Sequence, residues 1–155
     1  DIFDVKKFLQ DIDYTKFILK DMDREDFPRV SLILSSSVFQ WSKNFEELVK
    51  NISKSCRYLV FSIYLEDNLP EIKKHFSISL NYMTAEEIEN ILKKYFKNIK
   101  KESEIFIENF NSPIEVLRHL KNTGVTGFEK TEIKKIRSFS SAELTYKVGY
   151  FLCEK

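Results

Sequence analysis

Apolar and polar positions along the first half of the chain predict strands that alternate with a helix. Three short, continuous apolar runs are typical of buried strands: 17–19, 30–37 and 58–63. A short helical stripe over residues 1–9 precedes them. Between the second and third runs, Phe45, Leu48, Val49 and Ile52 recur at the spacing of one helical face and predict an amphipathic helix. This strand–helix–strand order favours a parallel sheet with right-handed crossovers.

The second half of the chain carries helix-start signals. Thr84 and Glu87 form a capping-box pattern, which predicts a helix that begins directly after Thr84. The segment 112–115 repeats this pattern with Pro113 at the first helical position, and Gly124 stands where a helix would end. Two helices are therefore expected in this half.

Two further strands are expected in the second half. Residues 104–110 form one, and 144–153 form a longer one in which Leu144, Tyr146, Val148, Tyr150 and Leu152 share a face. We expect these two strands to pair antiparallel, because no long helix follows the last one. The sequence thus predicts an α/β fold with a mixed sheet, parallel strands first and an antiparallel pair last.

Composition and charge exclude several classes of protein. The chain has 155 residues, the usual size of one domain, and no apolar run approaches the roughly 20 residues that span a bilayer. Its net charge of +1 argues against a dedicated nucleic-acid-binding protein. With two Cys and two His, a structural zinc site of the usual ligands is not expected, and the free thiols fit a reducing cytoplasm.

Candidate binding residues follow the predicted parallel strands, at the edge where open α/β sheets bind ligands. These strand ends are 21–23, 35–37 and 62–64, which offer carboxylates, hydroxyls and the apolar Met22. An acid that accepts from ribose hydroxyls beside an apolar side chain suits a nucleoside. The alternative is that Asp21 and the serines only satisfy backbone groups at the strand ends.

Other candidates are less specific. For Trp41, after the second strand, core packing is the commoner role and pocket lining the alternative. Arg118, His119 and Lys121 are neighbours on a predicted helix and suit an anion, with a solvated surface as the alternative. Neither cysteine has the local His⁺ or helix N-terminus that would activate a thiol, so both are interpreted as structural. No nucleophile–base pair and no glycine-rich phosphate loop is found.

At these residues the chain resembles a known family. LILSSSVFQW, LNYMTAEEIENIL, SPIEVLRHLKNTGV and LTYKVGYFLCEK, in this order, look like the biotin-pathway malonyl-carrier-protein O-methyltransferases. The LRHLKNTGV helix together with the TY strand is the most specific part of the resemblance. Such enzymes have the class I methyltransferase fold, a Rossmann-like sheet whose last strand inserts antiparallel.

The resemblance implies roles for several residues. Asp1 matches the acid that holds the ribose of S-adenosylmethionine, and Asp21 and Met22 match the pair beside its adenine. Ser35 and Ser36 match the turn near its methionine part. For the substrate, the resemblance suggests Arg118, His119 and Lys121, while no catalytic residue and no metal ligand is assigned.

The resemblance also implies a partial domain. It places Asp1 at the end of the family's second strand, so residues 1–155 correspond to the C-terminal two-thirds of one domain, without the first strands and the glycine-rich loop. The implied function is methylation of the free carboxylate of malonyl-acyl carrier protein or malonyl-CoA in biotin biosynthesis, in the cytoplasm. Candidates for contact with the acidic carrier are Arg118, His119 and Lys121, with Lys130, Lys134, Lys135 and Arg137. The alternative is a solvated charged surface, which is the preferred interpretation for the second group.

Two other functions remain open. One is a related methyltransferase that acts on another small acid. The other is a non-catalytic fragment that binds a partner or forms a homo-oligomer, which would cover the exposed edge of the sheet.

Overall fold

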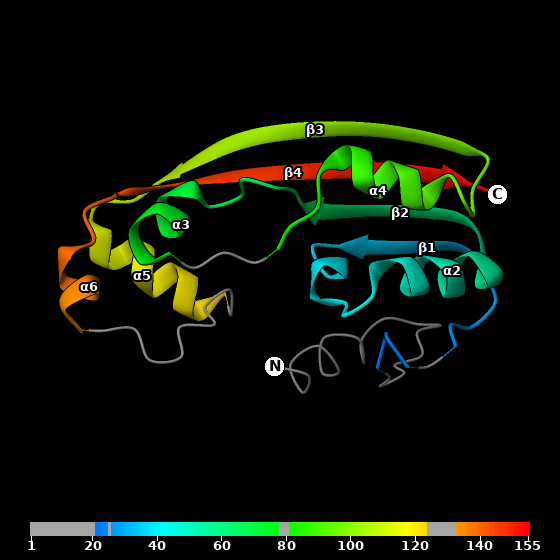
Figure 1. Ribbon diagram of the computed structural model, residues 1–155, viewed down its shortest axis with the longest axis horizontal. Coiled ribbons are helices and arrows are strands. Elements are labelled where there is room, and N and C mark those ends of the chain that lie inside the picture. The colour runs from blue at the N-terminus through cyan, green and yellow to red at the C-terminus, as the bar shows by residue number, and fades with distance from the viewer. Residues whose placement is uncertain (1–20, 25, 78–80, 124–132) are drawn as a thin grey trace, which may run out of the picture.

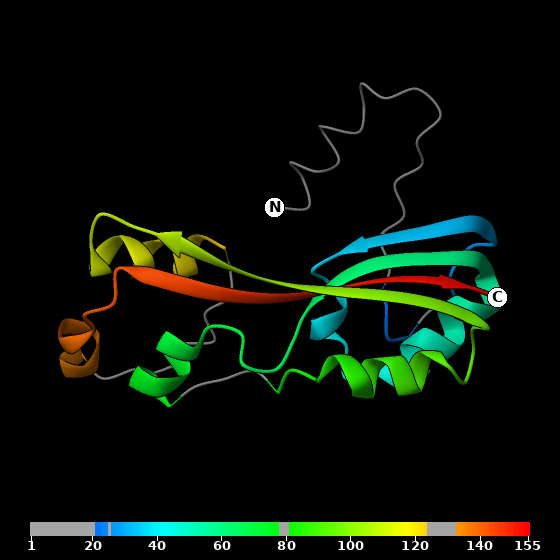
Figure 2. The same ribbon diagram turned by 90° about the horizontal axis from the view of Figure 1, so that it is seen from above.

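The protein is described here by a computed structural model that covers residues 21–24, 26–77, 81–123 and 133–155 (Figure 1). The helices are short and lie beside one long, twisted sheet, as the view from above shows (Figure 2). In chain order the elements are β1 Val30–Ser36, the 3₁₀ turn η1 Phe39–Trp41, α2 Phe45–Ser55, β2 Cys56–Tyr64, α3 Pro70–Phe76, α4 Ala85–Leu92, β3 Asn98–Asn109, α5 Pro113–Asn122, α6 Ile133–Ser138 and β4 Glu143–Glu154. None of these helices is long and apolar enough to cross a membrane.

The described strands form one mixed sheet in the order β1-β2-β4-β3. β1 and β2 are parallel, with Leu34 opposite Val60, and β4 is antiparallel to both of its neighbours, β2 and β3. The predicted mixed sheet, with parallel strands first and an antiparallel pair last, is confirmed. The predictions over 1–9 and 17–19 and at Gly124 lie outside the described residues.

The predicted helices are present, with one difference in how they begin. Thr84 and Glu87 form the expected capping box: the Glu87 backbone N–H donates to Thr84 Oγ1 over 3.1 Å and the Thr84 N–H to Glu87 Oε2 over 2.8 Å. At α5, the Ser112 side chain makes no capping bond, so the second predicted box is wrong. Glu115 Oε2 instead accepts a hydrogen bond from the Asn111 backbone N–H over 3.1 Å.

The buried side chains form two clusters. The first core lies under α2 and α4 and is centred on Phe61, whose ring stacks on Phe151 with centroids 5.0 Å apart. The second core lies where α3 and α5 pack against the start of β4. Its buried members are Leu69, Ile72, Phe76, Val116, Leu120, Phe139, Leu144 and Tyr146.

The two cores lie on opposite faces of the sheet. The register of β4 runs without a break against both neighbours, so Leu144 and Tyr146 leave one face while Phe151 and Cys153 leave the other. Gly149 stands where the two buried stretches meet. A Cβ there would lie 2.9 Å from the Phe151 ring, so a side chain larger than hydrogen would force Phe151 or Leu65 to move.

The described helices cover one face of the sheet over only part of its length. Five apolar residues on the face of the second core, beyond the reach of α3 and α5, form what we call the open face: Leu32, Leu34, Val60, Tyr150 and Leu152. Leu34 is 70% exposed and Leu152 43% exposed. The prediction that 30–37 forms a strand is confirmed, whereas the prediction that this strand is buried is wrong. Likewise, the shared face predicted for β4 exists, but only its first half is buried.

Candidate functional site

The carboxyl ends of β1 and β2 meet at the same edge of the sheet, where both arrowheads end in Figure 1. Ser37 follows β1 in the left-handed region, with φ of 50°, and its backbone N–H donates to the Ser62 carbonyl over 3.0 Å. The hydroxyl of Ser62 donates to that of Ser36 over 3.3 Å. This tight turn lets the chain leave β1 directly into η1, so the residues after the turn stand at the strand ends.

A pocket of about 190 Å³ opens at this edge. Three segments build its wall: η1 with the loop that follows it, the end of β2, and the residues before α4. The lining residues are Phe39, Gln40, Ser42, Lys43, Phe45, Ile63, Tyr64, Asn81, Tyr82 and Met83. Lys43 is the one cation among them, so the wall combines apolar and aromatic side chains with polar groups and a single positive charge.

Gln40, which lines the pocket, carries an acceptor without a partner. Its Nε2 donates to the carbonyl of Ser37 over 2.6 Å, which fixes the side chain against the turn after β1. Its Oε1 is buried and accepts no hydrogen bond from any described residue. Because a buried acceptor without a donor is costly, this atom favours a ligand that brings an N–H or O–H group.

Asp21 and Asp23, two acids before β1, differ in the contacts that they make. Asp23 is held by two hydrogen bonds. Its Oδ2 accepts from the Lys43 backbone N–H over 3.0 Å, and its Oδ1 accepts from the Ser42 hydroxyl. The Lys43 N–H and, next, the Ser42 hydroxyl lower the pKa of Asp23. Asp23 therefore ties the segment before β1 to the pocket loop.

The predicted cofactor residues lie near this loop with different exposures. Asp21 is exposed and pairs with Arg24 over 3.3 Å, whereas Met22 is half-buried and packs against the first core. Ser36 is exposed beside Ser62, and Ser35 is half-buried on the other face of β1. Asp1 lies outside the described residues.

Tyrosines connect the pocket to the second core. The ring of Tyr64 lies 6.1 Å from that of Tyr82 in the pocket wall and 6.0 Å from that of Tyr146 on β4, between centroids. Burial raises the pKa of Tyr82 and, more strongly, that of Tyr146, to which the Glu108 carboxylate adds. Both hydroxyls are therefore neutral at physiological pH and can donate hydrogen bonds.

The three residues predicted to bind an anion all lie on α5 but differ in exposure. His119 is half-buried, and its Nε2 lies 3.1 Å from the Tyr146 hydroxyl and 3.7 Å from Glu108 Oε2. Arg118 and Lys121 are exposed on α5. The LRHLKNTGV helix and the TY strand, which carried the resemblance, thus meet through the contact between His119 and Tyr146.

Some site residues were missed and one prediction was wrong. Tyr64 stood in a predicted strand end, but Gln40, Lys43 and Tyr82 were not singled out, because the pocket joins segments that no local pattern connects. Trp41, for which core packing was the preferred interpretation, is 46% exposed and does not line the pocket.

The cysteines and the acids offer no further site in the described part of the chain. Cys56 and Cys153 are buried free thiols, and burial raises the pKa of Cys153 to about 12. This agrees with their interpretation as structural. No three His, Cys, Asp or Glu side chains come together in the described ranges in a way that could hold a metal ion.

Solved structures with this fold define the class of protein. The chain superposes on the YcgJ protein from Bacillus subtilis with a TM-score of 0.68, at 9% identity, covering 99% of this chain and 77% of that one. A putative methyltransferase from Bacillus halodurans gives a TM-score of 0.67, also at 9% identity, covering 99% of this chain and 78% of that one. The fold is that of the class I methyltransferases.

Sequence relatives make the assignment more specific. The chain is 34% identical to the malonyl-[acyl-carrier protein] O-methyltransferase of Calditerrivibrio nitroreducens, over 82% of this chain and 58% of that protein. It is 33% identical to the protein of the same name from Porphyromonas gingivalis, over 79% of this chain and 56% of that protein. No protein-family model matches. The predicted resemblance is confirmed: the chain is related to these methyltransferases and spans little more than half of their length.

Proposed function

We propose that residues 1–155 are part of the single catalytic domain, its C-terminal two-thirds, of an S-adenosylmethionine-dependent O-methyltransferase. Its substrate would be the free carboxylate of a malonyl thioester, carried by acyl carrier protein or coenzyme A, in cytoplasmic biotin biosynthesis. One observation carries the proposal: relatives of that name align with 72–82% of the chain at 33–37% identity. The order of the sheet, with β4 antiparallel between β2 and β3, is compatible with it.

The pocket fits one part of the proposed cofactor. Its volume of about 190 Å³ is below the several hundred Å³ usual for a pocket that encloses a whole drug-sized ligand. It suits a group of the size of the methionine part. The unpartnered Gln40 Oε1 would accept from an ammonium group, and the Lys43 ammonium would attract a carboxylate. Ser35 and Ser36 would lie on the same part, with Asp21 and Met22 toward the nucleoside.

The proposed chemistry needs no general base. S-adenosylmethionine supplies an electrophilic methyl group when it is bound. The acceptor is already a nucleophile, because a carboxylic acid with an ordinary pKa of about 4 is ionised at neutral pH. This chain would hold the reacting groups in line and exclude water from them. The apolar side chains of Phe39, Ile63 and Met83 in the pocket wall are suited to excluding water.

The malonyl substrate, which accepts the methyl group, would bind beside α5. His119 is held against Tyr146, which touches Tyr64 of the pocket wall, so α5 is connected to the pocket by side-chain contacts. Arg118 and Lys121 would attract the negatively charged substrate from the exposed surface of the same helix. An Arg118→Ala variant should raise KM for the malonyl substrate, and an unchanged KM would argue against this role.

Calorimetric titration with S-adenosylmethionine tests the proposal, followed by transfer of a labelled methyl group to malonyl-carrier. We expect binding, and a Kd about tenfold higher in Gln40→Leu, which removes the amide from the pocket. The matched control is Asn90→Leu, which removes an amide from the exposed surface of α4 and should leave Kd unchanged. Absence of binding in the unmodified chain, or equal effects of both substitutions, would contradict the assignment of this pocket.

A further inference from the structure

The helix α6 makes few contacts with the other residues that the structure describes. None of its residues is buried, and its apolar residues Ile133 and Ile136 are 68% and 40% exposed. It is attached at its end, where His75 Nε2 donates to the Lys135 carbonyl over 2.9 Å and the buried Phe139 follows. A helix that buries none of its side chains contributes little to the core, so its sequence is free to serve a surface role.

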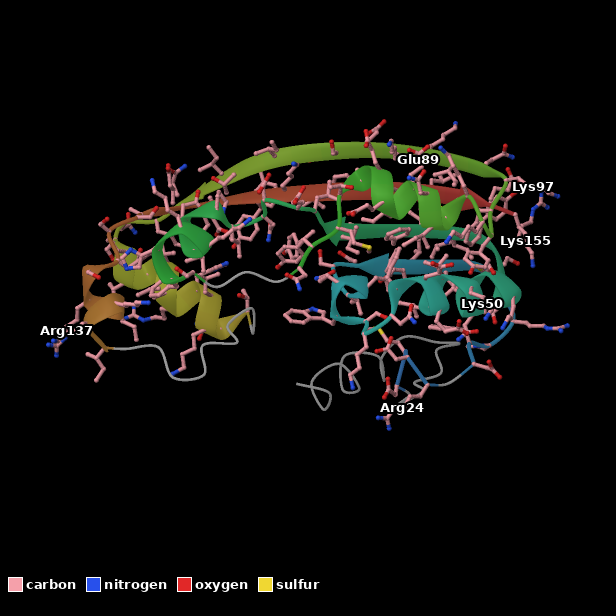
Figure 3. All side chains as sticks on the ribbon, in the orientation of Figure 1. Arg24, Lys50, Glu89, Lys97, Arg137 and Lys155 are labelled. Carbon is pink, nitrogen blue, oxygen red and sulfur yellow. The ribbon has the colours of Figure 1, made fainter. Side chains whose placement is uncertain are left out.

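Half of the six exposed residues of α6 are cationic. Lys134, Lys135 and Arg137 form no ion pair with any residue in the described ranges, and α6 contains no acidic residue. Figure 3 shows Arg137 projecting from one end of the molecule, far from the labelled Lys97 and Lys155 at the other. The helix α6 thus places three positive charges at this end of the molecule.

The exposed side of α5 continues this charge. Both α5 and α6 lie at the end of the molecule where β3 ends and β4 begins (Figures 1 and 2). Arg118 and Lys121 are exposed on α5, and its one carboxylate, Glu115, is occupied by hydrogen bonds to Asn111. We call Arg118, Lys121, Lys134, Lys135 and Arg137 the basic end.

We propose that the basic end, with Ile133 and Ile136 of α6, is the docking surface for the acidic protein that carries the malonyl group. The inference rests on the proposed function for the identity of the carrier. Cations that flank two exposed isoleucines complement an acidic helix with an apolar face. A nucleic acid would require a basic excess over the whole chain, whereas the net charge is +1. The same basic end includes Arg118 beside His119, so a docked carrier would present its thioester toward α5.

The test measures binding of the unacylated carrier protein, so it does not depend on methyl transfer. The variant is Lys134→Glu/Arg137→Glu, which reverses two charges on a helix that buries nothing and so leaves the fold intact. The matched control is Lys97→Glu/Lys100→Glu, which makes the same change of charge at exposed positions before and in β3. Titrations are run at low and at high salt, with anionic lipid vesicles as a parallel probe.

We expect the carrier Kd to rise about tenfold in the α6 variant and less than twofold in the control, with the difference reduced at high salt. Absence of carrier binding to the unmodified chain would overturn the proposal, as would equal weakening by both variants. Vesicle binding that depends on α6, without carrier binding, would assign the surface to a membrane instead. Carrier binding that depends on α6 in a chain that transfers no methyl group would keep the docking surface and reject the proposed activity.

Discussion

The two faces of the sheet differ in how completely helices cover them. On one face, α2 and α4 pack over Leu59, Phe61 and Phe151, none of which is more than 2% exposed. On the other face, α3 and α5 cover only the end near the start of β4, and Leu34 remains 70% exposed. Strands of similar apolar sequence therefore end up in different environments, because burial depends on which elements pack against each face.

The open face is apolar across three neighbouring strands. Leu34 of β1 lies opposite Val60 of β2, which in turn lies opposite Leu152 of β4. The exposure of this row follows from the lack of a covering helix among the described residues, and its sequence is as apolar as that of the covered face. The comparison predicts that equal truncations on the two faces have very different costs.

Phe61→Ala and Leu34→Ala should show the largest contrast. Removing the Phe61 ring leaves a cavity between Phe39, Phe45 and Phe151, so we expect a loss of about 3–5 kcal/mol in the free energy of unfolding. Leu34→Ala should change it by less than about 0.5 kcal/mol, because the side chain is already mostly in water. Urea unfolding measures both. A loss of several kcal/mol in Leu34→Ala would mean that the open face is covered in solution.

The second core can be weakened at the contact that joins α3 to β4. Glu71 accepts hydrogen bonds from the Thr145 hydroxyl over 2.6 Å and from the Thr145 backbone N–H over 3.1 Å. Glu71→Ala removes both, so we expect a loss of about 2 kcal/mol in the free energy of unfolding. Glu66→Ala, at an exposed carboxylate on the preceding loop, is the control and should have little effect. Equal losses in the two variants would show that the bonds to Thr145 do not stabilise the second core.

A helix or strand could be predicted from the sequence when its own residues carry the pattern that defines it. Phe45, Leu48, Val49 and Ile52 follow a helical period, and all four are buried under α2 as expected. The burial of β1 could not be predicted, because a run such as VSLILSS has the same sequence whether or not a helix covers it. The short helices α3 and α6 were not predicted, since neither is long enough to show a period.

The candidate site was predictable only where it coincides with strand ends. Ser36, Ser62 and Tyr64 stand where the carboxyl ends of β1 and β2 meet, which follows from their positions in sequence. Gln40 and Tyr82 could not be identified in this way, because they share a wall only after the segments on both sides of β2 have folded together. His119 was identified for its charge, whereas its contact with Tyr146 depends on the packing of α5 against β4.

The first turns of α4 and α5 have the same capping-box sequence pattern, but one helix lies beside the first core and the other beside the second. At α4, beside the first core, Thr84 caps the helix through the bond to the Glu87 N–H. At α5, beside the second, Ser112 makes no such bond. We expect Thr84→Ala to cost about 1 kcal/mol and Ser112→Ala a few tenths at most, both measured by urea unfolding. A reversed order would mean that Ser112 is the working cap in solution.

The smallest effect concerns a charge on the face that α2 and α4 cover. Glu89 of α4 forms ion pairs with Lys101 of β3 and with Lys93, which directly follows the helix. Lys101 and then Lys93 lower the pKa of Glu89 from 4.5 to about 2. Because the folded pKa is the lower one, the contribution of Glu89 to stability is complete above pH 4.5 and disappears as the pH falls toward 2. Glu89→Gln should therefore be less stable than the unmodified chain at neutral pH, and the two should converge in acid. Glu86→Gln, on the exposed surface of the same helix, should follow the unmodified chain at every pH. The free energy of unfolding of Glu89→Gln could instead differ from that of the unmodified chain by the same amount at every pH. The substitution would then act through packing and not through charge. In that case the ion pairs of Glu89 would not stabilise the contact between α4 and β3.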